Sequence, residues 1–246
     1  GPDLSTNGWR TWRRAVANQT QQGTALARYV DGLPVSGGGV CLLGDGSEES
    51  RGLLGAVASS LRAPVVLRAK VAPSATGPPP AVAAVSRVHC GVVVWGGFSE
   101  EGALMRRRLV EAGLLKVGFV GGDGLKDQTF LSITKGVGMG TVVACSCADL
   151  TTATDLPAQR FIQDYQSEFG LPPGTYAVEA FDVARMVLGA IRSGAATRAD
   201  VLLRLRSVRQ SDGLANVYRF SPDGELAPGS ARVRLYRDEG GRWIGM

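Results

Sequence analysis

The sequence predicts an α/β fold built on a doubly wound parallel sheet, and three observations support this prediction. The 246-residue chain contains short runs of consecutive apolar residues, such as 92–95 and 117–120. Continuous apolar runs indicate strands that are buried on both faces, as in a parallel sheet covered by helices. Both runs stop at a pair of glycines, and the segment between them carries apolar residues at helical spacing. This strand, helix and strand unit is the centre of the predicted fold.

Residues 24–147 predict five strands that alternate with helices. Short connections and right-handed crossovers then produce a doubly wound sheet of the usual domain size. The expected strands are 40–43, 65–71, 92–95, 117–120 and 141–145, and the expected helices lie around 26–33, 53–61, 81–86, 105–112 and 129–135.

The pattern changes after Leu150, where three helices follow one another without a strand between them. The last of these helices begins at a capping box formed by Thr197 and Asp200. Helices with apolar faces need a partner, so we expect their sheet to come from elsewhere. The expected helices are 157–169, 177–191 and 197–205, and two antiparallel strands, 217–220 and 233–236, are expected around a Pro-Asp-Gly turn.

Charge and hydropathy exclude two classes of partner. The net charge is +5, but the cations are scattered, and the one dense group, Arg106-Arg107-Arg108, lies on a helix whose other side is apolar. We therefore interpret this group as a solvated face and predict no nucleic-acid binding. The sequence has no apolar run of the ~18 residues that a membrane span requires, and no signal peptide is visible.

The cysteines do not predict a metal site. The chain has four cysteines without a CxxC pair, and His89 is its only histidine. Cys41 and Cys90 lie in or beside apolar runs, so we expect buried thiols. Cys145 and Cys147 flank one serine where a strand ends, and both a strained disulfide and free thiols remain open there.

No motif predicts catalysis. Gly44-Asp45-Gly46 follows a strand like a dinucleotide-binding loop, but Glu49 replaces the third glycine and would repel a pyrophosphate. A Rossmann-type NAD-dependent oxidoreductase is therefore the least favoured alternative. His89 precedes a buried strand, at the edge of the sheet opposite the expected ligand. We predict neither catalytic residues nor cofactors, and interpret the chain as a binding protein.

Two residues lie where such sheets bind ligands. Phe98 follows the strand at 92–95 and Asp123 follows the strand at 117–120, so both lie at the carboxyl ends of neighbouring strands. An aromatic ring beside a carboxylate suits a small cationic group such as an α-ammonium. The alternative interpretation is that Phe98 only caps the core and that Asp123 only caps a turn or helix.

The motifs together resemble a known family. The succession VVVWGGF, EAGL, FVGGDGL, CSCADL and GTYAVEAFDVARMVLGAI is similar to type I periplasmic binding proteins, in particular the branched-chain amino-acid binding proteins of ABC transporters. The CxC segment and the ending VYRFSPDGEL resemble actinobacterial members. The resemblance covers nearly the whole chain.

The resemblance implies two α/β lobes that are joined by three crossing segments and close on a small ligand. It also implies that the chain is truncated at its N-terminus, because the first lobe's opening strands have no counterpart here. The domains implied are the end of lobe 1 with the first crossing (1–23), lobe 2 (24–147), returning lobe 1 helices (148–216), and the third crossing with C-terminal strands (217–246).

The resemblance also assigns ligand contacts. Asp123 matches the acid that holds the ligand's α-ammonium, Phe98 matches an aromatic residue that packs on the ligand, and Tyr176 matches an aromatic residue of the returning lobe. Glu49 stands where relatives often carry tyrosine, which puts an aliphatic ligand in doubt and suits a polar or cationic one. The alternatives are a packing role for Tyr176 at a helix start and a solvated first-turn position for Glu49.

The function implied is that of the solute-binding component of an ABC importer for an amino acid or similar small zwitterion. An ABC transporter permease is the implied partner. The implied location is extracellular, with a lipid anchor on the missing N-terminal part as the only membrane attachment. The alternative is an extracellular ligand-sensing domain of a receptor or kinase.

Overall fold

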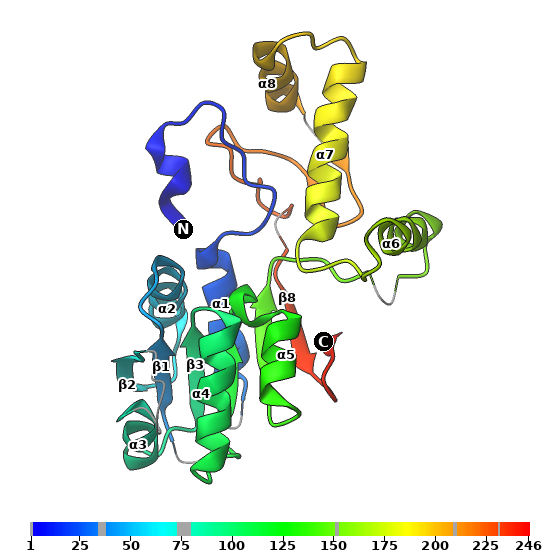
Figure 1. The fold of residues 1–246 in the computed structure, drawn as a ribbon. Helices are drawn as coiled ribbons and strands as arrows, with labels where there is room; N and C mark the ends of the chain where they lie inside the picture. The colour runs from blue at the N-terminus through cyan, green and yellow to red at the C-terminus, as the bar shows by residue number, and fades with distance from the viewer. Residues whose placement is uncertain (1, 34–37, 73–79, 151–152, 209–210, 231) are drawn as a thin grey trace. The chain divides into compact units, whose positions relative to one another are not determined.

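The chain forms two compact units in the computed structural model (Figure 1). The structure describes residues 2–33, 38–72, 80–150, 153–208, 211–230 and 232–246. One unit contains Asn18–Cys145 and Val233–Met246, and the other contains Asp3–Ala17 and Ser146–Arg232. None of the described helices combines the length and the apolar character that crossing a lipid bilayer demands.

The first unit contains a seven-stranded sheet in the order β2-β1-β3-β4-β5-β8-β9. Strands β1 to β5 pair in parallel, which confirms the predicted doubly wound sheet, whereas β8 and β9 are antiparallel additions. The strands are β1 (Val40–Gly44), β2 (Val65–Lys70), β3 (Val92–Gly96), β4 (Gly118–Gly121), β5 (Val142–Cys145), β8 (Arg234–Asp238) and β9 (Trp243–Gly245).

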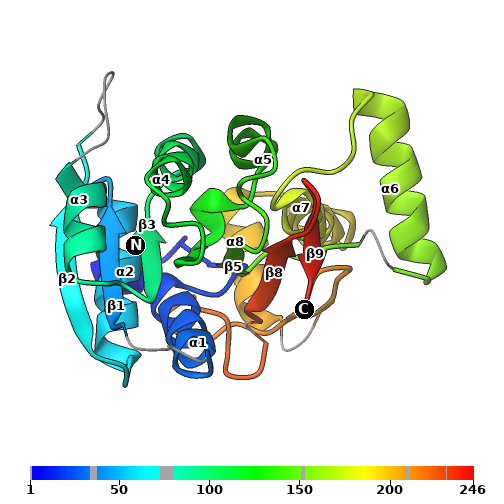
Figure 2. The same ribbon diagram turned by 90° about the horizontal axis from the view of Figure 1, so that it is seen from below.

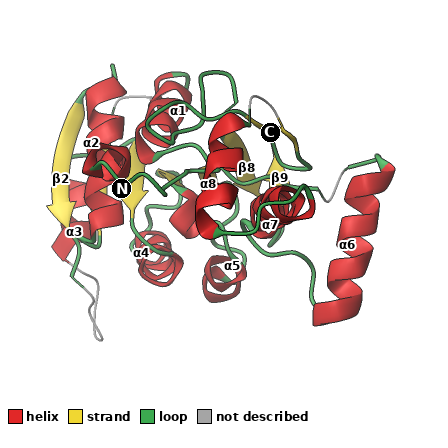
Figure 3. Cartoon of the chain, turned by 90° about the horizontal axis from the view of Figure 1, so that it is seen from above, coloured by secondary structure: helices red, strands yellow, loops and turns green. Residues whose placement is uncertain are grey.

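Helices cover both faces of this sheet, with α1 on one face and α4 and α5 on the other (Figures 2 and 3). The first face has an aliphatic core in which α1 and α2 meet valines of the central strands. The second face has a row of rings, Trp95, Phe119, Phe130 and Trp243, with neighbouring centroids 5.5–6.5 Å apart. The helices are α1 (Gln19–Asp31), α2 (Glu48–Ser60), α3 (Pro80–Arg87), α4 (Ser99–Glu111), the short η2 (Asp123–Leu125) and α5 (Gln128–Thr134).

The strand order places a topological switch point between β1 and β3. From β1 the chain first goes outward to β2 and then returns to β3 on the other side of β1. The connections after β1 and β3 therefore leave the sheet in opposite directions and open a crevice at the carboxyl ends of these strands. In doubly wound sheets this crevice is where ligands bind.

The predicted pairing of 217–220 with 233–236 is wrong. The turn at 222–224 does form, but it brings Phe220 back to Leu226, and β8 pairs instead with β5 and β9. The physical reason is that the outer edge of β5 has unpaired backbone groups, and β8 satisfies them by joining that edge.

The second unit contains three α-helices and only a two-stranded ladder among its described residues. The α-helices are α6 (Leu156–Phe169), α7 (Ala177–Arg192) and α8 (Arg198–Ser207), and the ladder pairs β6 (Ser211–Asp212) with β7 (Val217–Tyr218). A 3₁₀ helix, η1 (Pro2–Asn7), lies near the start of the sequence. Its small core contains Phe161, Val178 and Ala215. Several large apolar side chains of the helices are exposed, namely Leu156, Phe169, Phe181, Leu188, Ile191 and Leu203.

The cysteines differ from the expectation. Cys41 on β1 and Cys90, just before β3, form a disulfide, so the predicted buried thiols are wrong. The two residues come together because β1 and β3 are neighbours in the sheet, which the spacing of 49 residues along the chain does not reveal. Cys145 and Cys147 are disulfide-bonded as well, so free thiols are excluded there.

Candidate functional site

The candidate site lies at the carboxyl ends of β1, β3 and β4, beside the switch point. Gly124 shows how closely its loops approach one another, because a Cβ atom there would lie 2.5 Å from the carbonyl oxygen of Gly97. The turn that begins at Asp123 therefore packs directly on the loop that carries Phe98. This arrangement brings the neighbourhoods of two predicted ligand contacts together within one unit.

Asp123 is the first residue of η2, and its carboxylate is held by a side chain from another element. The Nε2 group of Gln22 on α1 donates to its Oδ2 at 3.0 Å. Helix α1 presents this glutamine because Asn18 and Gln21 form a capping box that fixes where the helix starts. Gly122, not Asp123, is the cap residue of η2. The carboxylate is thus oriented by Gln22, and the helix-cap alternative is not needed to explain it.

Phe98 precedes α4, and its side chain is 52% exposed. The backbone around it is fixed on both sides, because Phe98 donates its N–H to Asp45 at 3.3 Å while its carbonyl oxygen accepts from the Trp95 indole at 3.3 Å. Gly97 has φ of +133°, a conformation that residues with a side chain rarely adopt. A rigid loop that leaves an aromatic ring exposed is suited to contact a ligand, and the core-cap alternative does not fit this exposure.

Asp45 is a residue of this site that sequence reasoning missed. Its Oδ1 accepts from the backbone N–H of Ser47 at 2.8 Å, and its Oδ2 accepts from Phe98. Asp45 therefore ties the loop after β1 to the loop after β3. Its position directly after a strand, between two glycines, was the available signal. No group of described His, Cys, Asp and Glu residues has an arrangement that could hold a metal ion.

Glu49 lies in the first turn of α2, and both of its carboxylate oxygens are buried without a hydrogen-bond partner among the described residues. Burial raises the pKa of Glu49 to about 7, and the carboxylates of Asp123 and Asp45 act in the same direction. The solvated first-turn alternative for Glu49 is therefore not supported. The electrostatic effect of Asp123 also places Glu49 in the same group of acids.

Replacing Glu49 with glutamine is expected to change how stability depends on pH. The pKa of about 7 in the folded state exceeds the ordinary glutamate value of 4.5, so the folded state binds the proton more tightly. The contribution of Glu49 to the free energy of unfolding is therefore largest below pH 4.5, and it is lost as the pH rises through 7. We expect wild type to lose about 2–3 kcal/mol over this window, and Glu49→Gln not to. Urea unfolding at pH 5 and pH 8 measures the free energy of unfolding of both proteins. The same change between the two pH values in wild type and Glu49→Gln would contradict the prediction.

Tyr176 belongs to the second unit, so its place in the site stays a prediction. It precedes α7 with φ of +70°, which is rare for a residue with a side chain. Its hydroxyl group lies 3.0 Å from the Ser146 Oγ atom. This strained backbone and the hydrogen bond fix the direction of the ring.

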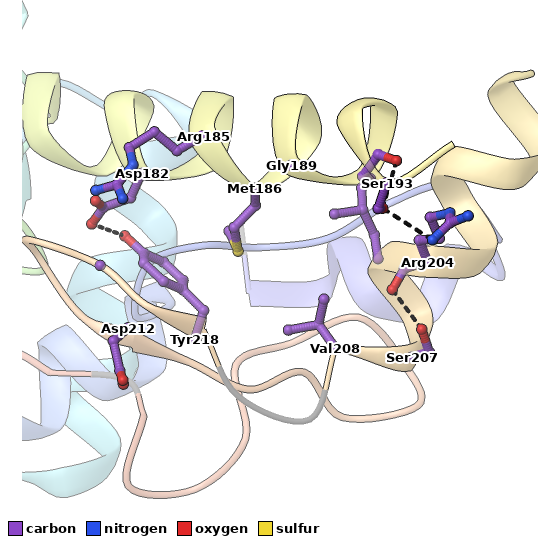
Figure 4. Close-up of a pocket in the computed structure, with 13 residues that line it drawn as sticks. Asp182, Arg185, Met186, Gly189, Ser193, Arg204, Ser207, Val208, Asp212 and Tyr218 are labelled. Carbon is purple, nitrogen blue, oxygen red and sulfur yellow. Dashed lines mark hydrogen bonds between the residues drawn. The ribbon is translucent and has the colours of Figure 1, made fainter. Parts of the chain in front are cut away.

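The second unit contains a cavity of about 520 Å³ between α7, α8 and the segment around β6. Its polar side chains bind one another (Figure 4). Buried Asp182 accepts from the Tyr218 hydroxyl and from two backbone N–H groups, and Arg204 donates to Ser193 at 3.0 Å. These contacts stabilise the unit internally, so the cavity is a weaker candidate than the acidic site of the first unit.

Comparison with known proteins gives one matching family and distant relatives. A family model described as periplasmic binding protein matches residues 10–239. A Leu/Ile/Val-binding protein homologue of Brucella melitensis is 22% identical over 251 residues, with all of this chain aligned. The chain spans 66% of that relative's length.

Solved structures share the fold at low sequence identity. A leucine-binding protein of Thermotoga maritima has a TM-score of 0.83 at 16% identity, and the match covers 100% of this chain and 69% of that one. An isoleucine complex of a branched-chain amino acid transporter substrate-binding protein from Streptococcus pneumoniae has a TM-score of 0.85 at 17% identity, covering 98% and 69%. A benzoate complex of an ABC transporter solute-binding protein from R. palustris has a TM-score of 0.81 at 15% identity, covering 100% and 68%.

Proposed function

Because this chain belongs to the periplasmic binding protein family, we propose that it is the solute-binding part of an ABC importer for an amino acid or a similar small zwitterion. The family match confirms the resemblance that the sequence motifs indicated. The observation that carries the proposal is the close contact between the Asp123 turn and the Phe98 loop beside the switch point.

The chemistry of this site favours a cationic group. Asp123, Asp45 and Glu49 supply three carboxylates, and the exposed Phe98 ring supplies an aromatic surface. An α-ammonium bound to Asp123 makes charge-assisted hydrogen bonds, and the ring adds attraction for the same cation. The benzoate bound by the R. palustris protein is an anion, and these three carboxylates would repel it. We therefore assign the site to the ammonium end of a zwitterion.

The second unit supports a two-lobe arrangement. Its three helices expose large apolar side chains, and the described residues provide only the β6–β7 ladder beside them. Exposed apolar surface of this kind needs a partner. We propose that 148–216 are helices of one lobe and that another part of the protein supplies the main sheet of that lobe. Residues 24–147 would form the opposite lobe, and 1–23 and 217–246 would contain crossing segments. Tyr176 would then contact the ligand from the lobe of 148–216.

Partners and location follow from the same proposal. An ABC permease would accept the ligand from the closed form, because hinge closure couples ligand binding to a change of lobe arrangement. The two disulfide-bonded cysteine pairs favour an oxidising compartment outside the cytoplasmic membrane. We also propose that a lipid anchor attaches the complete protein to the membrane. No catalytic residue is assigned.

A ligand screen on the complete protein that contains this chain tests the proposal. Thermal-shift measurements with the common amino acids and with benzoate should give stabilisation by one or more amino acids, since a ligand that binds only the folded state raises the melting temperature. Calorimetry then gives the affinity. Stabilisation by benzoate alone, or by no amino acid, would reject an amino-acid-binding function.

A further inference from the structure

We infer that Glu49 makes the proposed site selective for an amino acid with a basic side chain over one with an aliphatic side chain. This inference rests on the proposed function and names the ligand class of the same site. Glu49 would accept the second cationic group of the ligand, while Asp123 holds the α-ammonium. Glu49 is therefore proposed as a specificity-determining residue.

The hydrogen bonds of the site single out Glu49 among its three acids. Asp45 already accepts two backbone N–H groups, one on each oxygen, from Ser47 and Phe98. Asp123 accepts from Gln22. Glu49 differs, because both of its oxygens are buried and neither receives a hydrogen bond from the described residues. Buried polar groups in folded proteins normally have hydrogen-bond partners. Of the three acids, Glu49 is therefore the one whose missing hydrogen bonds a ligand would supply.

Nearby protein cations do not fill this role. The Arg51 guanidinium donates to the backbone oxygen of Gly46, and the end of the Lys70 side chain lies against Gly46. Neither residue hydrogen-bonds to the carboxylate of Glu49. Gln19, which approaches from α1, donates its side-chain amide to the backbone oxygen of Glu49 at 3.3 Å. The same amide lowers the pKa of the carboxylate, but it makes no hydrogen bond to either carboxylate oxygen and does not offset the effect of burial. The strongest charge effects on the carboxylate come from Asp123 and Asp45, which are both negative, and the positive amino terminus acts more weakly in the opposite direction without bonding it.

An aliphatic side chain would leave Glu49 buried without a partner, whereas an ammonium or guanidinium group would provide charge-assisted hydrogen bonds. A site that is built to bond a polar group of its ligand discriminates strongly against an analogue that lacks it. The same reasoning predicts proton release, since a pKa of about 7 leaves Glu49 partly protonated at neutral pH and a bound cation favours the ionised form.

The test compares lysine with norleucine, which has the same carbon chain without the terminal ammonium. Calorimetry on the complete protein should show lysine binding more than about tenfold more tightly than norleucine. In Glu49→Gln this preference should fall to within about threefold, because the amide carries no charge. Glu48→Gln is the matched control, since Glu48 is the exposed neighbour on the same helix turn, and it should keep the full preference.

The pH profile gives a second measurement. Lysine affinity should rise about tenfold between pH 6 and pH 8 in wild type and Glu48→Gln, and stay flat in Glu49→Gln. The charged groups that act on the carboxylate are Asp123 and Asp45, which raise its pKa, and the amino terminus, which lowers it least of all the causes. His89 precedes β3, at the amino end of that strand, so it is not at this site.

Three outcomes would overturn the inference. If wild type bound norleucine as tightly as lysine, the preference for a basic side chain would be rejected, but the proposed amino-acid-binding function would stand. A lysine preference that survives in Glu49→Gln would remove Glu49 as its cause. A folded wild-type protein, checked by circular dichroism, that stabilises with no amino acid would reject this inference together with the proposed function.

Discussion

Replacing Asp123 with alanine is expected to weaken amino-acid binding by the complete protein by about 2–5 kcal/mol, which is roughly 30-fold to several thousand-fold. The physical reason is that the ligand's ammonium would enter the crevice without its main counter-charge. The Nε2 group of Gln22 would at the same time lose the hydrogen bond that it donates to the Asp123 carboxylate. Calorimetric titration of wild type and variant with the same amino acid measures the effect.

Two further variants make the Asp123 result interpretable. Asp123→Asn keeps the shape and an acceptor for Gln22 but removes the charge, so most of the loss should persist if the charge is responsible. Glu111→Ala removes an acid from the exposed end of α4, where the side chain is 63% exposed, and should leave the affinity unchanged. An unchanged affinity in a well-folded Asp123→Ala protein would remove Asp123 from the site.

The central part of the fold could be predicted because its signals are local. The apolar runs at 92–95 and 117–120, each closed by a glycine pair, fall on β3 and β4. The pairing of β8 with β5 could not be predicted in this way, because it joins segments about ninety residues apart and nothing local marks the partner. The Cys41–Cys90 disulfide has the same origin, since it depends on which strands are neighbours.

The candidate site could be predicted only from positions just past the ends of strands. Phe98 and Asp123 each stand one glycine beyond β3 or β4, and the structure brings their loops together. Asp45 follows β1 directly, so its position was visible in the sequence but its role was not. The role of Asp45 depends on a hydrogen bond to the backbone of Phe98, 53 residues away, which no sequence pattern encodes. The state of Glu49 depends on burial and on two other acids, which are properties of the folded unit. The coupling among these acids can be predicted only when their positions in the folded unit are known.

Replacing both Cys41 and Cys90 with serine is expected to lower the free energy of unfolding by about 4 kcal/mol. This estimate follows from the loop that the bond closes, because the residues are 49 positions apart and the cross-link restricts the unfolded chain. Urea unfolding of the variant and wild type under oxidising conditions measures the difference. The Cys145→Ser/Cys147→Ser variant is the matched control for removing two bonded cysteines, and its residues are only two positions apart.

Ligand affinity should respond differently from stability in the Cys41→Ser/Cys90→Ser protein. Cys41 lies near the start of β1 and Cys90 precedes β3, so the disulfide is at the amino ends of the two strands. The loops that carry Asp45 and Phe98 follow the carboxyl ends of these strands. The remaining folded protein should therefore bind its amino acid within about twofold of wild type, because separate sites act additively. A large loss of affinity with unchanged unfolding would mean that the disulfide shapes the crevice itself.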